Sequence, residues 1–323
     1  MRASAPAKAN LFLKVLGRRP DGRHDLLCLT VPLTLADELT LEVADPPGGR
    51  PDPDGDSLSV ADDIGSPCVP TDPALTGRGS LVLRAVAAYR ERTGFPRGRV
   101  RARILKRIPY CAGLGGVSSD AAAVLRLLDS ASPSPLGGEG LRSLALPLGA
   151  DIPFFLWEPA PGIVRGAGEI LAPYGGPPLP PAIVLAGPGT ALPTGEVFRE
   201  YAAGSLREDG LTKHRPENSL NLSSAPGAAL PTLGTNDLLP AAFRLSPGLS
   251  GLREDMAAMA CGPHGLSGSG PTFWALCPDP EAASEAAREL ARRGRWSRAC
   301  GIVQAGGSVQ CPDPGLAGDG RRR

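Results

Sequence analysis

Residues 109–122 read Pro109-Tyr-Cys-Ala-Gly113-Leu114-Gly115-Gly116-Val117-Ser118-Ser119-Asp120-Ala-Ala122, a glycine-rich loop that runs directly into an apolar helix. The backbone N–H groups of such a loop point inward, and a helix N-terminus carries positive partial charge, so phosphate is a natural ligand. Side chains larger than hydrogen would hold the backbone away from that ligand. The pattern predicts a helix from Ser118 to about Ser130, with Ser118 and Ser119 either capping it or donating to phosphate.

This loop differs from the two best-known nucleotide-binding loops. No Gly-Lys-Ser/Thr follows at the spacing of a P-loop, and Ser118 stands where the dinucleotide fingerprint needs its third glycine. Taken alone, a glycine turn that merely packs under a helix explains the loop equally well.

Working outward, strand and helix patterns alternate along the chain, which predicts an α+β fold. Residues 7–16 form the first predicted strand, with Lys8 and Asn10 on one face. Further strands are expected at 26–35 and 38–43, split at Ala36-Asp37, and at 58–60, 100–104, 182–186 and within 266–277. Helices are expected at 80–93, 141–148, 194–203, 250–260 and 280–293, and long loops at 45–79 and 204–235.

Composition excludes several classes of protein. The chain has 323 residues, 42% of them hydrophobic and 21% charged, with net charge +1, so no overall field recruits nucleic acid or an anionic membrane. No apolar run approaches the ~18 residues of a membrane span, and Lys8, Asn10 and Lys14 interrupt any leader, so a cytoplasmic protein is expected. Seven cysteines without a CxxC pair predict reduced thiols rather than a zinc site or a disulfide framework.

Two further motifs are candidates for chemistry. In Gly149-Ala-Asp151-Ile-Pro153 the aspartate suits a helix N-cap, but a carboxylate held near a lysine can also orient or deprotonate an alcohol. The segment Leu266-Ser-Gly268-Ser269-Gly270-Pro-Thr272 is either a tight hairpin turn or a second glycine loop that closes over a substrate.

Together these motifs resemble the GHMP kinases. Pro6-Ala7-Lys8-Ala9-Asn10-Leu11, the loop at 113–120, residues 148–155 and Ser267–Gly270 stand in the same order as in that superfamily. More narrowly, the chain is similar to the 4-diphosphocytidyl-2-C-methyl-D-erythritol kinases of the non-mevalonate isoprenoid pathway. Residues 17–26 look like their "RRxDGYHEL", residues 166–169 like "GxGE" and residues 236–243 like "NDLxxxxF". The resemblance covers roughly residues 3–305.

The resemblance implies two α/β lobes and a reaction. Residues 1–157 would form a ribosomal-protein-like ATP-binding lobe, residues 158–311 a ferredoxin-like lobe, and residues 312–323 a disordered tail. The enzyme would move the γ-phosphoryl group of ATP to the 2-hydroxyl of the substrate. Asp151 would take the hydroxyl proton, and Lys8 would keep Asp151 ionised and neutralise charge on the phosphoryl group.

The glycine loop would hold the phosphates in this scheme. Its contributing residues would be Gly113, Leu114, Gly115, Gly116, Val117, Ser118 and Ser119, with Mg²⁺ between the phosphates. No carboxylate cluster marks a protein metal site, so phosphates, water and Ser119 would hold the ion.

The resemblance also implies a pocket for a cytidine diphosphate substrate. His24 would hydrogen-bond the cytosine edge, Phe198 would stack on the base, and Thr194 would lie nearby, while Asn10 would reach the other end of the substrate. Three positions depart from the family pattern: Arg23 replaces a tyrosine that sandwiches the base, Val117 replaces a glycine and Ser80 an asparagine. A guanidinium also stacks on bases, so Arg23 is a candidate for that contact.

Other readings remain open on sequence. A GHMP kinase for mevalonate or homoserine would share Lys8, Asp151 and the loop, but would leave His24 and Phe198 without a role. A non-catalytic nucleotide-binding relative is disfavoured because both Lys8 and Asp151 are present. A nucleic-acid binder is weakly supported, since basic and aromatic residues are not interleaved. A monomer and a homodimer are both compatible with the sequence.

Overall fold

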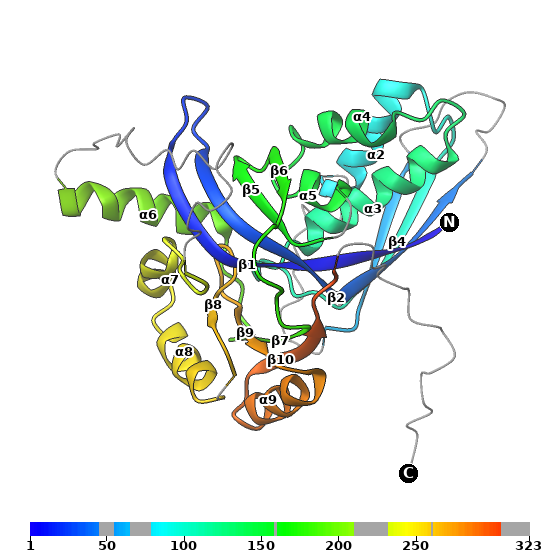
Figure 1. Ribbon diagram of the computed structural model, residues 1–323. Helices are drawn as coiled ribbons and strands as arrows, with labels where there is room; N and C mark the ends of the chain where they lie inside the picture. The colour runs from blue at the N-terminus through cyan, green and yellow to red at the C-terminus, as the bar shows by residue number, and fades with distance from the viewer. Residues whose placement is uncertain (45–54, 65–78, 158–159, 210–231, 260, 305–323) are drawn as a thin grey trace, which may run out of the picture.

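The computed structural model describes residues 1–44, 55–64, 79–157, 160–209, 232–259 and 261–304. Two sheets organise these residues, as expected for an α+β protein (Figure 1). The larger sheet has the order β3-β4-β2-β5-β6, with β1 paired to β2, and the smaller has the order β10-β7-β9-β8.

A long antiparallel hairpin links the two halves of the molecule. Strand β1 (Arg2–Arg18) pairs with β2 (His24–Val43) from Arg2↔Thr40 to Arg18↔His24, with three shifts in register. Its apolar residues are buried in a nearly continuous run, as in strands covered on both faces. Bridges Leu13↔Asn236 and Leu33↔Ile302 tie the hairpin to the second half, and Figure 1 shows it crossing the molecule. The hairpin therefore belongs to the larger sheet and also contacts the second half of the chain.

The predicted break at Ala36-Asp37 is wrong, because β2 runs through it without interruption. Asp37 is fully buried, and its carboxylate accepts hydrogen bonds from Lys106 and from the backbone N–H groups of Arg107 (2.6 Å) and Ile108 (2.9 Å). Aspartate is usually depleted in strands. Here these donors compensate for its burial, so the strand continues.

Helices cover one face of the larger sheet. They are α2 (Leu81–Thr93), α3 (Gly116–Ala131), α4 (Gly137–Ala145) and α5 (Ile152–Leu156) (Figure 1). Helix α2 begins at its N-cap Ser80, whose Oγ accepts from Leu83 N, and ends at Gly94 in the left-handed conformation. Strands β3 (Ser57–Asp62) and β4 (Val100–Lys106) pair in parallel beside them.

The start of α3 corrects the expected role of the serines. The helix begins at Gly116 rather than Ser118, and its N-cap is Gly115 at φ 71°, without a side-chain cap. Ser118 and Ser119 therefore lie inside the first turn and do not cap it. Val117 lies in the helix, so the backbone of this β-branched residue does not have to adopt a positive φ. Helix α4 also begins four residues before the predicted Leu141.

Strands β5 (Gly162–Gly166) and β6 (Ile170–Pro173) were not recognised in the sequence. β5 pairs with β2 from Leu26↔Gly166 to Thr30↔Gly162, which places residues 162–173 in the first sheet. The division of the chain into lobes at 157/158 stays a prediction, and these two strands lie on the later side of it.

The second half packs helices around the smaller sheet. Its strands are β7 (Ala182–Gly187), β8 (His264–Leu266), β9 (Phe273–Cys277) and β10 (Trp296–Gly301). Its helices are α6 (Thr194–Asp209), α7 (Leu239–Leu245), α8 (Leu249–Ala257) and α9 (Pro280–Arg292). Helix α6 extends into the predicted loop at 204–235. The rest of that loop, much of 45–79 and the predicted tail at 312–323 lie outside the described residues.

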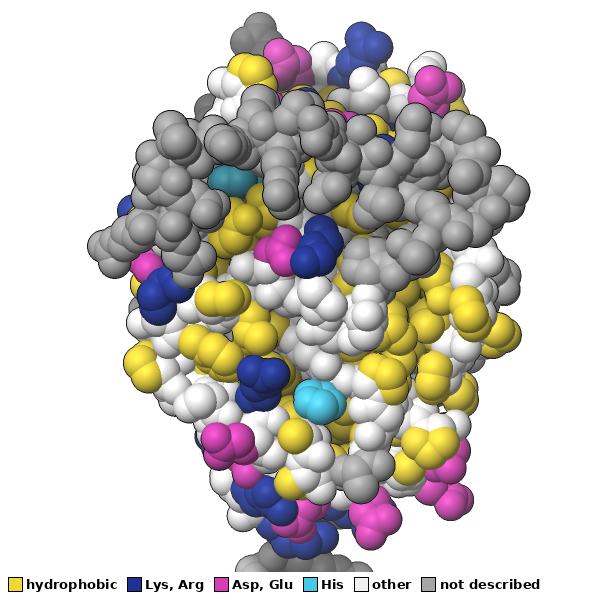
Figure 2. Space-filling model, turned by 60° about the vertical axis from the view of Figure 1, so that its left-hand side comes forward, with side chains coloured by type: hydrophobic (Ala, Val, Ile, Leu, Met, Phe, Trp, Pro, Cys, Tyr) yellow, Lys and Arg dark blue, Asp and Glu magenta, His cyan; other side chains and the backbone are white. Residues whose placement is uncertain are grey.

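The surface fits the near-neutral composition. Figure 2 shows basic and acidic side chains interspersed with apolar ones on the face that it presents. Within the described ranges, no helix combines the length and apolar character needed to cross a membrane.

Candidate active site

Lys8 and Asn10 form the centre of the site, on neighbouring inward positions of β1. Both are at least 94% buried, with 5% and 6% of their surface exposed. The ammonium group of Lys8 donates to Asn10 Oδ1 (2.5 Å), and Asn10 Nδ2 donates to Thr30 Oγ1 (2.9 Å) on β2. The predicted common face is confirmed, and Thr30 is an added member that the sequence analysis missed. This chain of hydrogen bonds fixes the direction of the Lys8 side chain.

Asp151 lies opposite Lys8 at the start of α5. Its Oδ2 is 3.9 Å from Lys8 Nζ, and 53% of its side chain is exposed. Asp151 occupies the N-cap position, yet its side chain makes no capping hydrogen bond. The carboxylate is therefore paired with a buried cation and remains accessible, which is the arrangement that an alcohol substrate needs.

The first glycine loop reaches Lys8 through its backbone. Lys8 N donates to Leu114 O (2.9 Å), and a Cβ on Gly115 would lie 3.1 Å from Lys8 Cγ and 2.9 Å from the Phe155 ring. Gly113 and Gly115 have φ of 74° and 71°, in the left-handed region that glycine adopts freely. The loop is thus built for close approach of backbone, as a phosphate cradle requires.

Ser119 carries a buried hydroxyl that lacks a partner. The residue is 1% exposed, and its Oγ makes no hydrogen bond among the described residues. A buried unpaired hydroxyl is costly unless a ligand satisfies it. One hydroxyl beside a phosphate cradle fits Mg²⁺ that is held mainly by phosphates and water. The described residues contain no cluster of three metal-ligating side chains.

The second glycine loop, Ser267–Gly270, packs against the first. Ser267 Oγ donates to Gly113 O (2.9 Å) and accepts from Asn10 N (3.2 Å). A Cβ on Gly268 would lie 3.2 Å from Lys8 Nζ. Asn236 Nδ2 donates to Leu266 O (2.9 Å) and Gly268 O (2.8 Å), so it holds the loop from behind. Ser267 and Asn236 were part of the resemblance but not of the predicted site.

The predicted base pocket lies at the far end of the β1–β2 hairpin. The His24 and Phe198 rings stack with centroids 4.9 Å apart at 22°, and Tyr201 meets His24 edge-on at 6.2 Å. Partial burial, with a smaller contribution from Arg18, lowers the pKa of His24, so its imidazole is neutral at neutral pH. Arg23 is exposed, and its backbone N–H donates to Asp21 Oδ1 (3.0 Å). The structure brings His24 and Phe198 together and leaves Arg23 at the rim.

Thr194 joins this end of the site to the second glycine loop. Thr194 lies at the start of α6, four residues before Phe198, and its Oγ1 is 3.0 Å from Ser269 Oγ.

An ion pair lies at the tip of the β1–β2 hairpin. Arg19 Nη1 pairs with Glu169 Oε1 (2.5 Å), which lies in the turn between β5 and β6. The two segments that most narrowed the resemblance, residues 17–26 and 166–169, therefore meet.

A buried charge cluster lies next to the first glycine loop and the start of α3. Lys106, 1% exposed, pairs with Asp37 and with Asp120 Oδ2 (2.8 Å) on α3. Burial lowers the pKa of Lys106, but the two carboxylates outweigh burial and raise it. Burial raises the pKa of Asp120 to about 7, against the opposing effect of Lys106. Sequence reasoning missed this cluster because its members are separated along the chain and meet through the fold.

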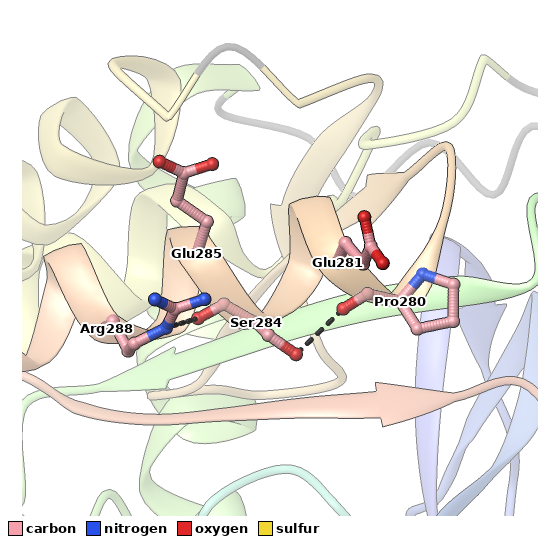
Figure 3. Close-up of a pocket in the computed structure, with 5 residues that line it drawn as sticks. All are labelled: Pro280, Glu281, Ser284, Glu285 and Arg288. Carbon is pink, nitrogen blue, oxygen red and sulfur yellow. Dashed lines mark hydrogen bonds between the residues drawn. The ribbon is translucent and has the colours of Figure 1, made fainter.

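Two surface hollows lie apart from the predicted site residues. One follows an exposed side of α9, where Ser284 Oγ donates to Pro280 O (2.8 Å) and Arg288 Nε to Ser284 O (3.3 Å) (Figure 3). Ser284 and Arg288 are thus engaged within the helix. The other, of about 20 Å³, lies between Tyr110, Thr190 and Trp296.

Comparison with known proteins agrees with this geometry. The GHMP kinases N terminal domain matches residues 80–158, and the GHMP kinases C terminal domain matches residues 221–295. A crystal structure of Methanococcus jannaschii mevalonate kinase superimposes with a TM-score of 0.61 at 13% identity, covering 94% of this chain and 98% of that one. The fold and the two domain matches define a GHMP kinase.

Proteins with higher sequence identity to this chain identify its family among the GHMP kinases. The 4-diphosphocytidyl-2-C-methyl-D-erythritol kinase of Thermus thermophilus is 37% identical over 95% of this chain and 98% of its own length. The enzyme of the same name from Anaeromyxobacter sp. (strain K) is 39% identical over 93% and 87%. A crystal structure of 4-(cytidine 5'-diphospho)-2C-methyl-D-erythritol kinase is 36% identical, with a TM-score of 0.66 over 93% and 98%. The chain belongs to the 4-diphosphocytidyl-2-C-methyl-D-erythritol kinase family.

Proposed function

We propose that this chain transfers the γ-phosphoryl group of ATP to the 2-hydroxyl of 4-diphosphocytidyl-2-C-methyl-D-erythritol, giving the 2-phosphate and ADP. The observation that carries the proposal is the 3.9 Å pair of Lys8 and Asp151 beside two glycine loops. The relatives named for this activity match over almost the whole chain, which supports the choice of substrate.

Asp151 acts on the acceptor hydroxyl. As the hydroxyl oxygen bonds to the γ-phosphorus, the bond from that phosphorus to the β,γ-bridging oxygen breaks, and the hydroxyl proton passes to Asp151. Phosphoryl transfer depends mainly on alignment and charge stabilisation, so Asp151 contributes by orienting the hydroxyl as well as by accepting its proton. Its half-exposed carboxylate is accessible for this contact.

Lys8 and the loops provide the positive environment. Lys8 Nζ, held by Asn10, neutralises charge on Asp151 and on the transferring group. Backbone N–H groups of residues 113–118 cradle the phosphates, and the N-terminus of α3 adds to the field. The N–H of Ser119 donates to Gly115 O (2.9 Å), so this residue contributes through its hydroxyl. Mg²⁺, when bound, neutralises phosphate charge, and Ser119 Oγ is the side chain that fits it.

The cytidine end of the substrate occupies the hairpin tip. Neutral His24 hydrogen-bonds the cytosine edge and Phe198 offers a ring face, while Arg23 lies at the rim where it can stack on the outer face. Thr194 and Asn10 line the path between the two ends. Cytoplasmic location and a monomeric or dimeric state stay predictions.

The test is ADP release by the purified protein with Mg²⁺ and ATP, measured in parallel with the cytidine substrate, mevalonate and homoserine. We expect turnover with the cytidine substrate, and a loss of about 10²–10⁴-fold in kcat for Asp151→Asn. Asp279→Asn is the matched control, because asparagine also caps a helix and Asp279 lies at the start of α9. Turnover with mevalonate or homoserine would be consistent with the proposed roles of Lys8 and Asp151 but would overturn those of His24 and Phe198. ATP binding without any turnover would overturn the kinase assignment.

A further inference from the structure

Two cysteines meet at the open end of the β8–β9 hairpin, outside the site described above. The sulfur atoms of Cys261 and Cys277 are 2.9 Å apart, and both residues are thiols in this structure. Backbone hydrogen bonds hold the two segments together next to the pair: Gly262 N donates to Leu276 O (2.8 Å) and Leu276 N to Pro263 O (2.9 Å). A disulfide bond is about 2.05 Å long, so bond formation needs the sulfur atoms to approach by only about 0.9 Å.

We propose that Cys261 and Cys277 are a reversible dithiol–disulfide pair that reacts with a small-molecule disulfide such as oxidised glutathione. Disulfides in reducing compartments are typically transient or redox-sensing, so a reversible bond is compatible with the reduced thiols expected from the sequence.

The two thiols have different roles in this reaction. Cys261 is half-buried, so a small disulfide can reach it, whereas Cys277 is fully buried. Burial, followed by the hydrogen bond and charge of Cys261, raises the pKa of Cys277 to about 12, which makes Cys277 a poor first nucleophile. Cys261 therefore attacks first and Cys277 second.

The two steps balance as ordinary thiol–disulfide exchange. The Cys261 thiolate attacks one sulfur of oxidised glutathione, the glutathione S–S bond breaks, and one glutathione leaves as a thiolate. Cys277 then loses its proton and attacks Cys261 Sγ, which expels the second glutathione. The protein loses two electrons and two protons, and oxidised glutathione becomes two glutathione thiols.

The position of the bond gives it a structural consequence. Residues 261–277 enclose β8, the glycine loop Ser267–Gly270 and β9, so the disulfide would close this hairpin into a ring. The same loop carries Ser267, which contacts Asn10 and Gly113. Oxidation would therefore restrict the motion of one wall of the site.

The test treats the full-length folded protein with oxidised glutathione, blocks remaining thiols with N-ethylmaleimide, and maps peptides without reduction. We expect a peptide linked through Cys261 and Cys277, its disappearance after dithiothreitol, and slower amide exchange across residues 266–272 in the oxidised protein. In Cys277→Ala we expect glutathione to remain attached to Cys261, because the second thiol is absent. In Cys261→Ser we expect Cys277 to stay unmodified.

Exposed Cys111 serves as an internal marker that the reagent reacts. If Cys111 is modified while Cys261 and Cys277 both remain alkylatable, the proposal is wrong. It is equally wrong if Cys261 is found linked mainly to another cysteine, or if Cys277→Ala, folded by circular dichroism, does not trap glutathione at Cys261.

Discussion

The hydroxyl of Ser267 donates a hydrogen bond to the carbonyl oxygen of Gly113 at 2.9 Å, and so joins two glycine loops that are 154 residues apart. The same hydroxyl accepts from the backbone of Asn10, two residues from Lys8. One small side chain therefore connects the first glycine loop, the first strand and the second glycine loop.

Replacing Ser267 with alanine should reduce kcat by about tenfold, because two hydrogen bonds of about 0.5–1.5 kcal/mol each are lost and the loops lose their register. Steady-state kinetics with varied ATP measure this. Ser284→Ala is the matched control, since its hydroxyl donates to Pro280 O within its own helix and lies outside the site. Equal activity of both variants would show that the Ser267 contact does not position the site.

Gly113→Ala should reduce activity far more than Gly22→Ala, although both glycines have a positive φ. A Cβ at Gly113 would lie 2.2 Å from Ser267 O, whereas a Cβ at Gly22 would have no atom within 4 Å, although Gly22 has φ of 84°. Both alanines incur about 1–2 kcal/mol of backbone strain. Only Gly113→Ala should also lower kcat/KM for ATP, by about 100-fold, because the loops must separate. Similar kinetics for the two variants would contradict this.

Lys106→Met should lower the free energy of unfolding by about 3–5 kcal/mol, because it leaves the buried Asp37 and Asp120 without a cation. Lys14→Met is the control: Lys14 is 38% exposed and pairs with Asp237, and its loss should cost under about 1 kcal/mol. Urea unfolding of both variants gives the comparison.

The same cluster predicts a pH dependence of stability. The pKa of Asp120 is raised to about 7 in the folded protein from 3.8, so the folded state binds more protons between these values. The contribution of Asp120 to stability therefore decreases as pH rises through that range. In Lys106→Met the unfolding free energy is lowered relative to that of the unmodified protein, and we expect this difference to be smaller when urea unfolding is repeated at pH 5 instead of pH 8. A deficit that does not change with pH would contradict the role of the carboxylates.

His24 should make substrate binding sensitive to acid. The pKa of His24 is lowered by burial and by Arg18, so the neutral form predominates at neutral pH and the midpoint of protonation lies below the ordinary value of 6.5. Falling pH should raise KM for the cytidine substrate, with little change in KM for ATP. His24→Gln should raise KM about tenfold at pH 8, as expected for a lost hydrogen bond, and remove the acid effect. An unchanged acid effect in that variant would assign it to another group.

Local patterns allowed much of the fold to be predicted. The alternation around Lys8, the helix at 80–93 and the glycine loop before α3 all depend on neighbours within a few residues. The failures share a cause: Asp37 reads as a strand breaker until Lys106 and the amides of residues 107 and 108 are placed beside it. Similarly, β5 and β6 are short, and the pairing of β5 with β2 and of β6 with β5 provides the signal that the sequence lacks.

The site was predicted in the same uneven way. Lys8, Asn10 and Asp151 belong to motifs with a recognisable order, and the structure brings them together. Thr30 contacts Asn10 from the neighbouring strand, and no spacing in the sequence indicates it. Ser267 belongs to the second glycine motif, but its contact with Asn10 depends on the fold. Of the two roles considered for Ser118 and Ser119, helix capping is excluded because Gly115 is the N-cap and the helix begins at Gly116.

The β1–β2 hairpin carries both ends of the proposed substrate site on one continuous pair of strands. Lys8 pairs opposite Pro32, and His24 pairs opposite Arg18 next to the turn. The span between the reacting group and the base is therefore set by covalent backbone and strand register, at about 3.3 Å per residue, and not by how the lobes open. The hairpin therefore selects ligands by length, because a molecule that is too short to reach both ends loses one set of contacts.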